Sequence, residues 1–307
     1  MSQSPIPGEM LELDRRAPGF PERLEMLGDT PERLFVIGQI PSAPMVALVG
    51  SRDADRGMIR YTADLAADLT ARGLVVLSGG AAGIDTAAHR GALEAGGSTV
   101  AIIGSGFDHM YPPANRELFR EITQSGALIS EFEPGTPPTR WTFPKRNRLV
   151  AAMACAVIVI QASARSGALI TARVARGLEV PVGAVPGSVN ESKSRGTNGL
   201  IRDGAALIED ASDVMRLMDG SARSGQLSLP EMNSRGKETA SEAPVPVGIS
   251  ENEALVFDVL GETPMHIDDV ASTIGLGASE TGASLMSLEL SGFVEDRGGK
   301  YFVRSTG

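Results

Sequence analysis

The stretch MVALVGSRDADRGMIRYTADLAADLTARGLVVLSGG, residues 45–80, decides the fold. It opens with an apolar run of strand length at residues 45–49, continues with a helical pattern over residues 58–72, and returns to an apolar run at residues 74–77. A strand that is apolar at nearly every position has both of its faces buried. Two such strands joined by a helix predict a parallel sheet that is covered by helices on both faces.

The same alternation continues to residue 185. Because crossovers between parallel strands are right-handed, this order gives a doubly wound sheet. We therefore predict an α/β, Rossmann-like doubly wound domain over residues 45–218. Its further strands are expected at 99–103, 127–129, 156–160 and 181–185, and its further helices at 84–95, 115–123, 145–154 and 168–178.

The remaining segments differ in composition. Residues 1–44 are charged and rich in Pro, with a helical patch at 21–27, and are predicted to form a short helical N-terminal extension. Residues 219–247 are rich in Gly, Ser, Pro and charge without an apolar period, which predicts a disordered linker. Residues 248–307 have the order of a small winged-helix domain: helices at 250–260, 266–274 and 279–291, then a hairpin at 293–303.

The overall composition is that of an ordinary globular protein, with 42% apolar and 21% charged residues. The single cysteine, Cys155, cannot form an internal disulfide, which suits a reducing compartment. The N-terminus lacks the pattern of a signal peptide, and no apolar run approaches the roughly 20 residues of a membrane span. We expect a cytoplasmic protein without a membrane segment.

Charge is distributed unevenly along the chain. The formal net charge is −10, which by itself argues against a nucleic-acid binder. Residues 249–304 hold ten acids and three bases (−7), residues 1–44 hold seven acids and four bases (−3), and residues 45–217 hold 17 acids and 18 bases (+1). Residues 134–178 contain seven bases and no acid, which predicts a basic surface within an acidic protein.

Glycine and serine follow nearly every predicted strand. Ligands of doubly wound sheets bind at the carboxyl ends of the strands, where loops lead into helix N-termini. Glycine there lets backbone amides approach an anion closely. Five such loops on one edge of the sheet predict a phosphate-binding rim: residues 49–52, 78–85, 104–108, 161–171 and 185–187.

Two cationic motifs stand at this edge. Gly50-Ser-Arg52 follows the first predicted strand, and an arginine there can hold a phosphate through two parallel hydrogen bonds. Phe143-Pro-Lys-Arg-Asn-Arg148 places three cations in the predicted first turn of a helix, against the helix dipole, a conflict that a bound polyanion would relieve. Trp141 and Phe143 can stack on bases, with packing in the core as the alternative for both.

A third motif, Ser166-Gly-Ala-Leu-Ile-Thr171, opens the helix after the fifth strand of the predicted domain. Ser166 is predicted to cap this helix. The exposed amides of the same turn can also bind a phosphate, and the two roles are compatible.

No set of residues predicts catalysis or metal binding. The three histidines, His89, His109 and His266, have no metal-ligand spacing. His89 follows Asp85 by one helical turn, which favours a local helix contact over a catalytic base. The chain lacks a G-x-S-x-G elbow, a Walker A loop and a G-x-G-x-x-G motif after the first strand. We expect no enzyme activity, no metal and no cofactor.

The third helix of the predicted winged-helix domain carries Glu280 and Glu289 and no Lys or Arg. A helix that reads the DNA major groove should carry cations. We therefore interpret this domain as a protein-contact or regulatory element.

Eight motifs of this chain, in this order, resemble the DprA/Smf family of DNA-processing proteins over about residues 20–210. The resemblance implies a protein that is not an enzyme, binds single-stranded DNA and forms a homodimer. It further implies protection of incoming DNA and loading of the RecA recombinase onto it during natural transformation or recombination. The motifs are Gly50-Ser-Arg52, Ser78-Gly-x-Ala-x-Gly-Ile-Asp85 with His89, Tyr111-Pro112 with Asn115, Ile129-Ser-Glu131, Phe143-Pro-Lys-Arg-Asn-Arg148, Ser166-Gly-x-Leu-Ile-Thr-Ala172, Val185-Pro-Gly187, and Gly196-Thr-Asn-x-Leu-Ile201 with Gly204-Ala205.

The resemblance also implies site residues. Ala82 stands where relatives often have a basic residue, and the N-terminal helical domain of many relatives is expected to be shortened here. Carried over position by position, the DNA pocket comprises Gly50, Ser51, Arg52, Lys145, Arg146, Asn147 and Arg148, with Ser166 and Gly167 beside them.

Two other functions would rely on the phosphate loops or on the winged-helix domain. A nucleoside-monophosphate phosphoribohydrolase would hold one nucleotide on the phosphate loops. Its group carries Pro-Gly-Gly-x-Gly-Thr followed by Glu, where this chain has Arg165-Ser-Gly-Ala-Leu-Ile-Thr171 and no acid until Glu179. A transcription factor would use the winged helix as its main DNA contact, and the acidic third helix argues against that function.

Overall fold

The computed structural model describes residues 8–220, 250–260, 265–274, 276–297 and 301–304. The chain divides into two units, Met1–Leu227 and Ser228–Gly307. The predicted linker at 219–247 lies almost wholly outside the described residues.

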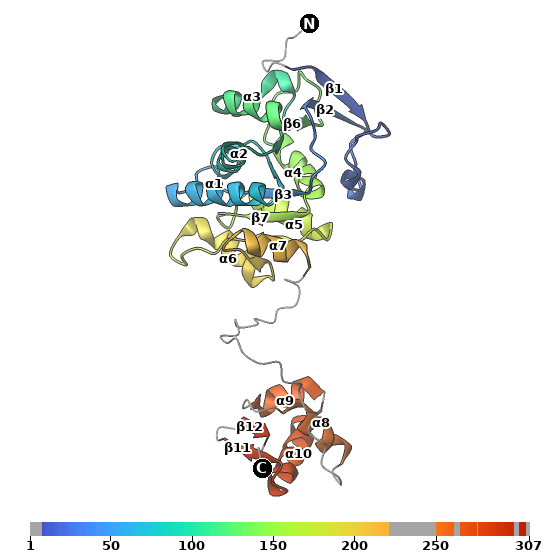
Figure 1. Ribbon diagram of the computed structural model, residues 1–307, viewed down its shortest axis with the longest axis vertical. Coiled ribbons are helices and arrows are strands. Elements are labelled where there is room, and N and C mark those ends of the chain that lie inside the picture. Colours follow the sequence, from blue (N-terminus) through green and yellow to red (C-terminus); the bar gives the residue numbers. More distant parts are fainter. Residues whose placement is uncertain (1–7, 221–249, 261–264, 275, 298–300, 305–307) are drawn as a thin grey trace. The chain divides into compact units, whose positions relative to one another are not determined.

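The described part of the N-terminal unit is built on a nine-stranded sheet in the order β1-β2-β6-β5-β4-β3-β7-β8-β9 (Figure 1). From β6 to β9 in this order all strands are parallel, whereas β2 pairs antiparallel with β6 and β1 antiparallel with β2. The predicted doubly wound α/β sheet is thus confirmed. The strands are β1 (Met10–Asp14), β2 (Arg33–Gly38), β3 (Met45–Val49), β4 (Val75–Ser78), β5 (Thr99–Ile102), β6 (Ala127–Ser130), β7 (Ala156–Val159), β8 (Val182–Ala184) and β9 (Ala206–Leu207).

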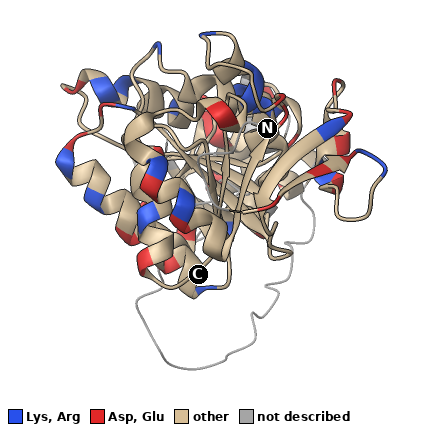
Figure 2. Ribbon diagram, turned by 90° about the horizontal axis from the view of Figure 1, so that it is seen from above, with Lys and Arg blue, Asp and Glu red and all other residues tan. Residues whose placement is uncertain are grey.

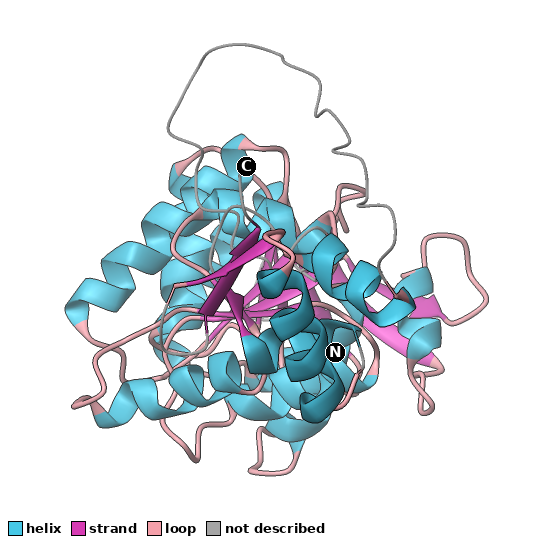
Figure 3. Ribbon diagram, turned by 90° about the horizontal axis from the view of Figure 1, so that it is seen from below, coloured by secondary structure: helices cyan, strands magenta, loops and turns pink. Residues whose placement is uncertain are grey.

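Helices flank this sheet on both faces (Figures 1 and 3). The apolar side chains of α1, α2, α3 and α7 pack on one face, and those of α4, α5 and α6 pack on the other. None of the described helices is long and apolar enough to cross a membrane. Their bounds are α1 (Arg56–Ala71), α2 (Ile84–Glu94), α3 (Arg116–Ser125), α4 (Thr142–Met153), α5 (Ala168–Gly177), α6 (Arg195–Arg202) and α7 (Ala211–Met218).

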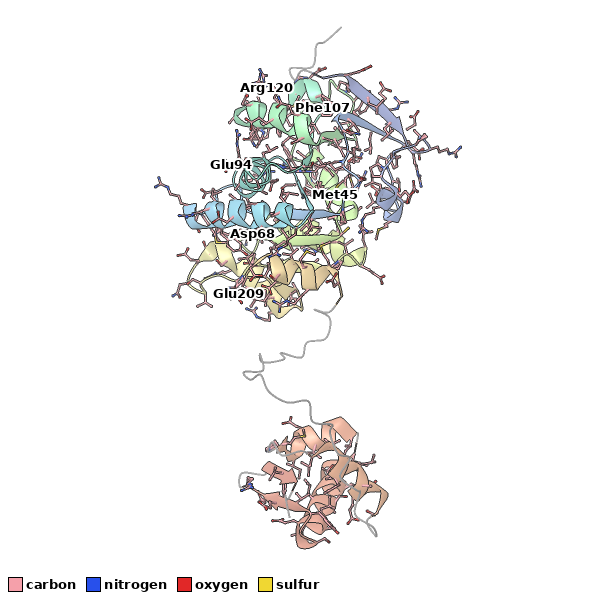
Figure 4. The ribbon with its side chains drawn as sticks, viewed as in Figure 1. Met45, Asp68, Glu94, Phe107, Arg120 and Glu209 are labelled. Atoms are coloured by element: carbon pink, nitrogen blue, oxygen red, sulfur yellow. The ribbon has the colours of Figure 1, made fainter. Side chains whose placement is uncertain are left out.

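Alternate residues of the central strands explain the two layers. In β3, Val46 and Leu48 pack with α1 and α2, whereas Ala47 and Val49 pack with α4 and α5, and all four are buried. This is the pattern that a continuous apolar run predicts. Side chains drawn on the ribbon in Figure 4 include buried Met45 at the start of this strand.

The N-terminal segment corrects the prediction of a helical extension over 1–44. Within its described part, the structure has the two strands β1 and β2, with the short 3-10 helix η1 (Glu22–Met26) between them. Strand β2 is buried over Leu34, Phe35, Val36 and Ile37 and extends the sheet beyond β6. The prediction fails because the Pro-rich, charged composition of the whole segment hides this short apolar run.

The winding of the chain reverses between two neighbouring strands. From β3 the chain continues to β4 on one side, whereas from β7 it continues to β8 on the other side, and β3 pairs with β7. The loops that leave these two strands therefore turn away from each other. In doubly wound sheets this reversal leaves a crevice at the carboxyl ends of the strands, where ligands bind.

The C-terminal unit confirms the predicted winged-helix order. Three helices pack around Val256, Phe257, Leu285, Leu288 and Val294, next to a three-stranded sheet in the order β10-β12-β11. Glu280 and Glu289 are exposed on the third helix. The elements are α8 (Glu251–Val259), β10 (Met265–His266), α9 (Ile267–Ile274), α10 (Ala278–Leu290), β11 (Val294–Asp296) and β12 (Tyr301–Arg304).

His89 on α2 is fully buried against the sheet. The Thr99 hydroxyl donates to the carbonyl oxygen of Val76 at 2.6 Å, so the 2.7 Å contact between His89 Nδ1 and Thr99 Oγ1 is donated by the imidazole. Burial lowers the pKa of His89 from 6.5 to about 3. The predicted local helix contact with Asp85 is replaced by a contact to β5, and His89 is a neutral core residue.

The buried imidazole makes the stability of the protein depend on pH. The unfolded chain takes up a proton at His89 below about pH 6.5, whereas the folded chain resists it down to about pH 3. Stability is therefore lost as the pH falls through this window. We expect the wild type to lose about 2 kcal/mol more unfolding free energy than His89→Asn between about pH 7 and about pH 5. Urea unfolding of both proteins measures this difference, and equal losses would contradict the assignment.

Candidate functional site

A cavity of about 350 Å³ opens at the switch point between β3 and β7. Seven of the nine predicted site residues line it: Gly50, Ser51, Arg52, Arg146, Asn147, Ser166 and Gly167. Lys145 and Arg148 do not. The cavity wall also includes Gly79, Ala81, Asp85 and Ser163, which lie in the predicted rim loops 78–85 and 161–171 but are not among the nine predicted pocket residues.

The loops after β3 and β7 are clamped together at the cavity. The Ser51 amide donates to the carbonyl oxygen of Gln161 at 2.8 Å, and the Gln161 side-chain amide donates to Asp55 Oδ2 at 2.6 Å. A Cβ atom on Gly50 would lie 2.7 Å from Ile84 Cγ1 on α2 and 3.1 Å from the Gln161 carbonyl oxygen, so a side chain there would push the loop after β3 away from both. Gly50 is therefore required by packing, and the clamp fixes where the Arg52 backbone lies.

Arg52 is exposed and lies against an aromatic ring. Its guanidinium carbon is 4.9 Å from the centre of the Phe143 ring, a distance typical of a cation–π contact. The Tyr111 ring is a further 5.8 Å from Phe143. Trp141 is 71% exposed, with the Arg140 guanidinium 4.9 Å from its ring, so the core alternative is wrong for Trp141. One cation–aromatic contact thus lies at the cavity, where Arg52 meets Phe143, and a second joins Arg140 to Trp141 just before α4.

Arg146 forms the floor of the cavity and is only 4% exposed. Its Nη1 donates to the carbonyl oxygen of Ile102 at 2.6 Å. A Cβ atom on Gly79 would lie 1.8 Å from the same Nη1, so only glycine leaves room for the guanidinium. Burial lowers the pKa of Arg146 to about 10, which still leaves it charged at neutral pH.

The buried carboxylate of Asp85 offsets this charge. Asp85 Oδ2 accepts hydrogen bonds from the backbone amides of Gly79 at 3.1 Å and Ala81 at 3.2 Å. Burial raises the pKa of Asp85, while the positive charge of Arg146 lowers it. The carboxylate is thus committed to holding the loop after β4 and to balancing Arg146.

The side chains of Arg148 and Lys145 lie close to Glu131 rather than to Asp85. Arg148 Nη2 lies 2.6 Å from Glu131 Oε2 and its Nε lies 2.9 Å from Asp29 Oδ2, and its side chain is 12% exposed. Lys145 Nζ is 3.5 Å from the same Glu131 oxygen, but its side chain is 54% exposed. Consecutive helical residues point in directions about 100° apart, so one run of cations cannot face one cavity. The structure therefore leaves Arg148 out of the pocket.

The helix dipole repels the cations of residues 145–148 less than predicted. Helix α4 begins at Thr142, so Lys145 to Arg148 lie beyond its first three residues. The dipole acts mainly within the first turn of a helix, and Glu131, Asp29 and Asp85 supply nearby negative charge. The predicted conflict, which a bound polyanion would relieve, is therefore smaller than expected, since of these cations only Lys145 lies in the first turn of α4.

The start of α5 forms the opposite wall. Its N-cap is Gly167 rather than the predicted Ser166, whose hydroxyl accepts from the Ala168 amide at 3.3 Å. Nothing lies within 4 Å of a Cβ atom built on Gly167, so this wall is open to a ligand. The Asn147 side-chain amide reaches the Gly167 carbonyl oxygen at 3.5 Å and ties α4 to α5 across the cavity.

Fewer than the five predicted loops form the phosphate-binding rim. The loops after β3, β4 and β7 line the cavity, whereas residues 104–108 and 185–187 do not. Gly104 instead packs against Phe143, whose Cδ1 would lie 2.9 Å from an added Cβ atom. Figure 2 shows charged residues on the helices and loops around the central strands.

The chemistry of the cavity is that of an anion site. Arg52 and Arg146 supply positive charge, and Ser51, Asn147, Ser163 and Ser166 supply polar groups. Asp85 is the acid among the lining residues; its carboxylate accepts hydrogen bonds from two backbone amides and lies in the field of the Arg146 charge. No group of three or more potential metal-ligating side chains occurs among the described residues.

The charge pair beneath the cavity predicts coupled effects on stability. Asp85→Asn leaves Arg146 buried without its counter-charge, and Arg146→Met leaves Asp85 buried without its own. We expect each change to destabilise the fold by about 3 kcal/mol. The double variant should lose about 1–3 kcal/mol less than the sum of the single variants. Urea unfolding of all four proteins gives this coupling, with exposed Asp53→Asn as the control; strictly additive losses would show that the two charges do not interact.

Comparisons with known proteins agree with this architecture. A family described as DNA recombination-mediator protein A matches residues 13–219, and one described as the DprA winged helix domain matches residues 238–300. A putative DNA processing protein DprA from Mycobacterium tuberculosis is 39% identical over 294 residues, covering 94% of this chain and 73% of that protein.

Two solved structures share the fold and a substantial part of the sequence. DNA processing protein A from Streptococcus pneumoniae has a TM-score of 0.65 at 38% identity, covering 67% of this chain and 74% of that one. DNA processing protein A from Helicobacter pylori, described for its single-stranded DNA binding mode, has a TM-score of 0.62 at 30% identity, covering 70% of this chain and 97% of that one. The chain therefore belongs to the DprA/Smf family of DNA-processing proteins.

Proposed function

We propose that this protein binds single-stranded DNA through its phosphate backbone at the cavity between β3 and β7, protects it and delivers it to the RecA recombinase. The observation that carries the proposal is the cationic cavity at the switch point, in a chain whose Helicobacter pylori relative is described by its single-stranded DNA binding mode. Loading of RecA during natural transformation or recombination, a homodimeric state and a cytoplasmic location belong to the same proposal, and they are supported by membership of the DprA/Smf family.

The size of the cavity supports a single strand over a duplex. At about 350 Å³ it lies at the lower end of the range for small-ligand sites, which suits about one nucleotide and is too small to enclose a double helix. Arg52 is exposed at its mouth, and the buried Arg146 adds fixed positive charge beneath it. A phosphate in the cavity would meet both charges without any reading of base identity.

The exposed aromatic side chains suit unpaired bases. Trp141 and Tyr111 are among the exposed large apolar residues, and Phe143 lies between Tyr111 and Arg52. Stacking of a base on such a ring contributes about 1–3 kcal/mol and tolerates every base. We therefore expect binding with little sequence preference, in which phosphates enter the cavity and bases lie against the rings.

A binding role suits the site better than catalysis. His89 is buried and neutral, and Asp85 is engaged by two amides. The first turn of α5 holds no acid, whereas the phosphoribohydrolase alternative needs a glutamate after its phosphate loop. We infer that the protein acts on DNA without chemical conversion.

The first test separates charge from stacking. Fluorescence anisotropy with labelled oligo-dT, over a salt series and with a duplex control, should show salt-sensitive binding that prefers the single strand. Arg52→Ala/Lys145→Ala should weaken it and reduce the slope of log affinity against log salt by up to about 1.4, since each lost phosphate contact removes about 0.7. Trp141→Ala should weaken it by about 1–3 kcal/mol with an unchanged slope.

The control for charge is Arg120→Ala, an exposed arginine on α3 that pairs with Glu117 (Figure 4). It should bind as the wild type does. Wild-type binding that is flat between about 50 and about 200 mM salt would refute phosphate recognition. Release of free base from a nucleoside monophosphate would instead support the enzymatic alternative.

A truncation tests the role of the C-terminal unit. Because the cavity is built wholly from the N-terminal unit, deletion of residues 221–307 should leave the affinity for oligo-dT within about twofold of the wild type, which is about 0.4 kcal/mol. Abolished binding would instead make the winged helix the main DNA contact. The same anisotropy titration measures either result.

A further inference from the structure

A second cationic groove lies between α5 and α6, outside the cavity described above. It has a volume of about 320 Å³, and its lining includes Arg173, Arg176 and Arg195, together with Leu169, Leu200 and the acid Asp203. Leu169, Arg173 and Arg176 are spaced i, i+4 and i+7 on α5, so they share one side of that helix. Three cations against one acid give the groove a net positive charge.

The arginines of this groove are largely available to a ligand. All three are exposed. Arg176 is held in place because its Nη2 donates to the carbonyl oxygen of Leu200 at 3.1 Å. Among the described residues, no ion pair within 4.0 Å joins Arg173 or Arg195 to an acid. This contrasts with Arg148, whose charge is paired with Glu131 and Asp29.

The groove and the cavity share one loop. Ser163, Ser166 and Gly167 line the cavity, and Ala164 of the same loop lines the groove. The start of α6 is pinned to this loop, because the Gly196 amide donates to the carbonyl oxygen of Ala162 at 2.8 Å. A Cβ atom on Gly196 would lie 2.6 Å from the Ser163 carbonyl oxygen, so this approach requires glycine. The two sites are therefore held next to each other on either side of residues 163–167.

We propose that the groove is a second phosphate subsite for the DNA strand that occupies the cavity. The strand leaves the cavity over residues 163–167, passes the exposed Arg165 and sets further phosphates against Arg173, Arg176 and Arg195. This inference rests on the function proposed above. An acidic protein segment would also find cations here, but the shared loop makes the groove a continuation of the cavity, which favours the same polyanion.

The experiment compares two lengths of DNA on the full chain. Anisotropy titrations use oligo-dT of about 4 and about 16 nucleotides, the range of single-strand site sizes, over a salt series. The proteins are the wild type, Arg173→Ala/Arg195→Ala and the charge-matched control Arg72→Ala/Arg120→Ala, whose two arginines are exposed and line neither site. Thermal unfolding and sedimentation report the fold and the oligomeric state of each.

The groove variant should bind the long oligonucleotide at least about tenfold more weakly, with a salt slope shallower by about 1.4, which corresponds to two lost phosphate contacts. It should bind the short oligonucleotide as the wild type does. The control should match the wild type on both. Arg173→Lys/Arg195→Lys, which keeps the charge, should retain most of the salt slope.

Three results would overturn the inference alone: an unchanged affinity for the long oligonucleotide, an equal loss on both lengths, or a loss that follows only from an altered oligomeric state. An unchanged affinity for the long oligonucleotide would indicate that the groove binds a protein partner instead. A wild type that binds neither oligonucleotide would instead refute the proposed function itself, so the two failures are distinguishable.

Discussion

Strands β3 and β7 are hydrogen-bonded neighbours from which the chain departs in opposite directions, and the rest of the N-terminal unit is arranged around this reversal. It places α4 and α5 on one face and α1 and α2 on the other. It also leaves a gap where the loops diverge, and the bond from the Ser51 amide to the Gln161 carbonyl keeps that gap at a fixed width. The anion site thus follows from the strand order of the sheet. Gly50 and Gly79, which lack side chains, leave room for the neighbouring loops and for Arg146 to complete it.

Arg52 and the cations of residues 140–148 divide into two kinds. Arg146 and Arg148 interact with the protein itself. Arg146 donates to the Ile102 carbonyl oxygen and is balanced by the charge of Asp85, and Arg148 pairs with Glu131 and Asp29. Arg52 and Arg140 are exposed beside aromatic rings and remain free to meet a ligand. A buried charge without a partner destabilises a protein, so the buried cations of this basic motif are paired with groups of the protein itself. Part of the motif therefore stabilises the fold. The excess acids lie in residues 1–44 and 249–304, which allows a chain with net charge −10 to present a basic site.

The sequence predicted the central part of the fold well and its edges poorly. The six strands and five helices expected between residues 45 and 185 were found close to their predicted positions, because each strand is apolar at nearly every position and the helices alternate with them. Strands β1 and β2 were missed because each is short and lies in a Pro-rich, charged segment. Strand β9 and helices α6 and α7 were missed for a similar reason, since each is too short to show a clear period.

The site divides in the same way. The sequence by itself determined which loops and residue types meet at the carboxyl edge of the sheet, because parallel strands bring their following loops together wherever they stand in the chain. Only the tertiary structure decided the direction of each side chain: Arg146 into the floor, Arg148 toward Glu131, and Trp141 to the surface rather than the core. It also brought Arg195 beside Arg173 and Arg176. Side-chain direction depends on the exact helix start and on packing partners distant in sequence, and no local pattern of residues specifies either.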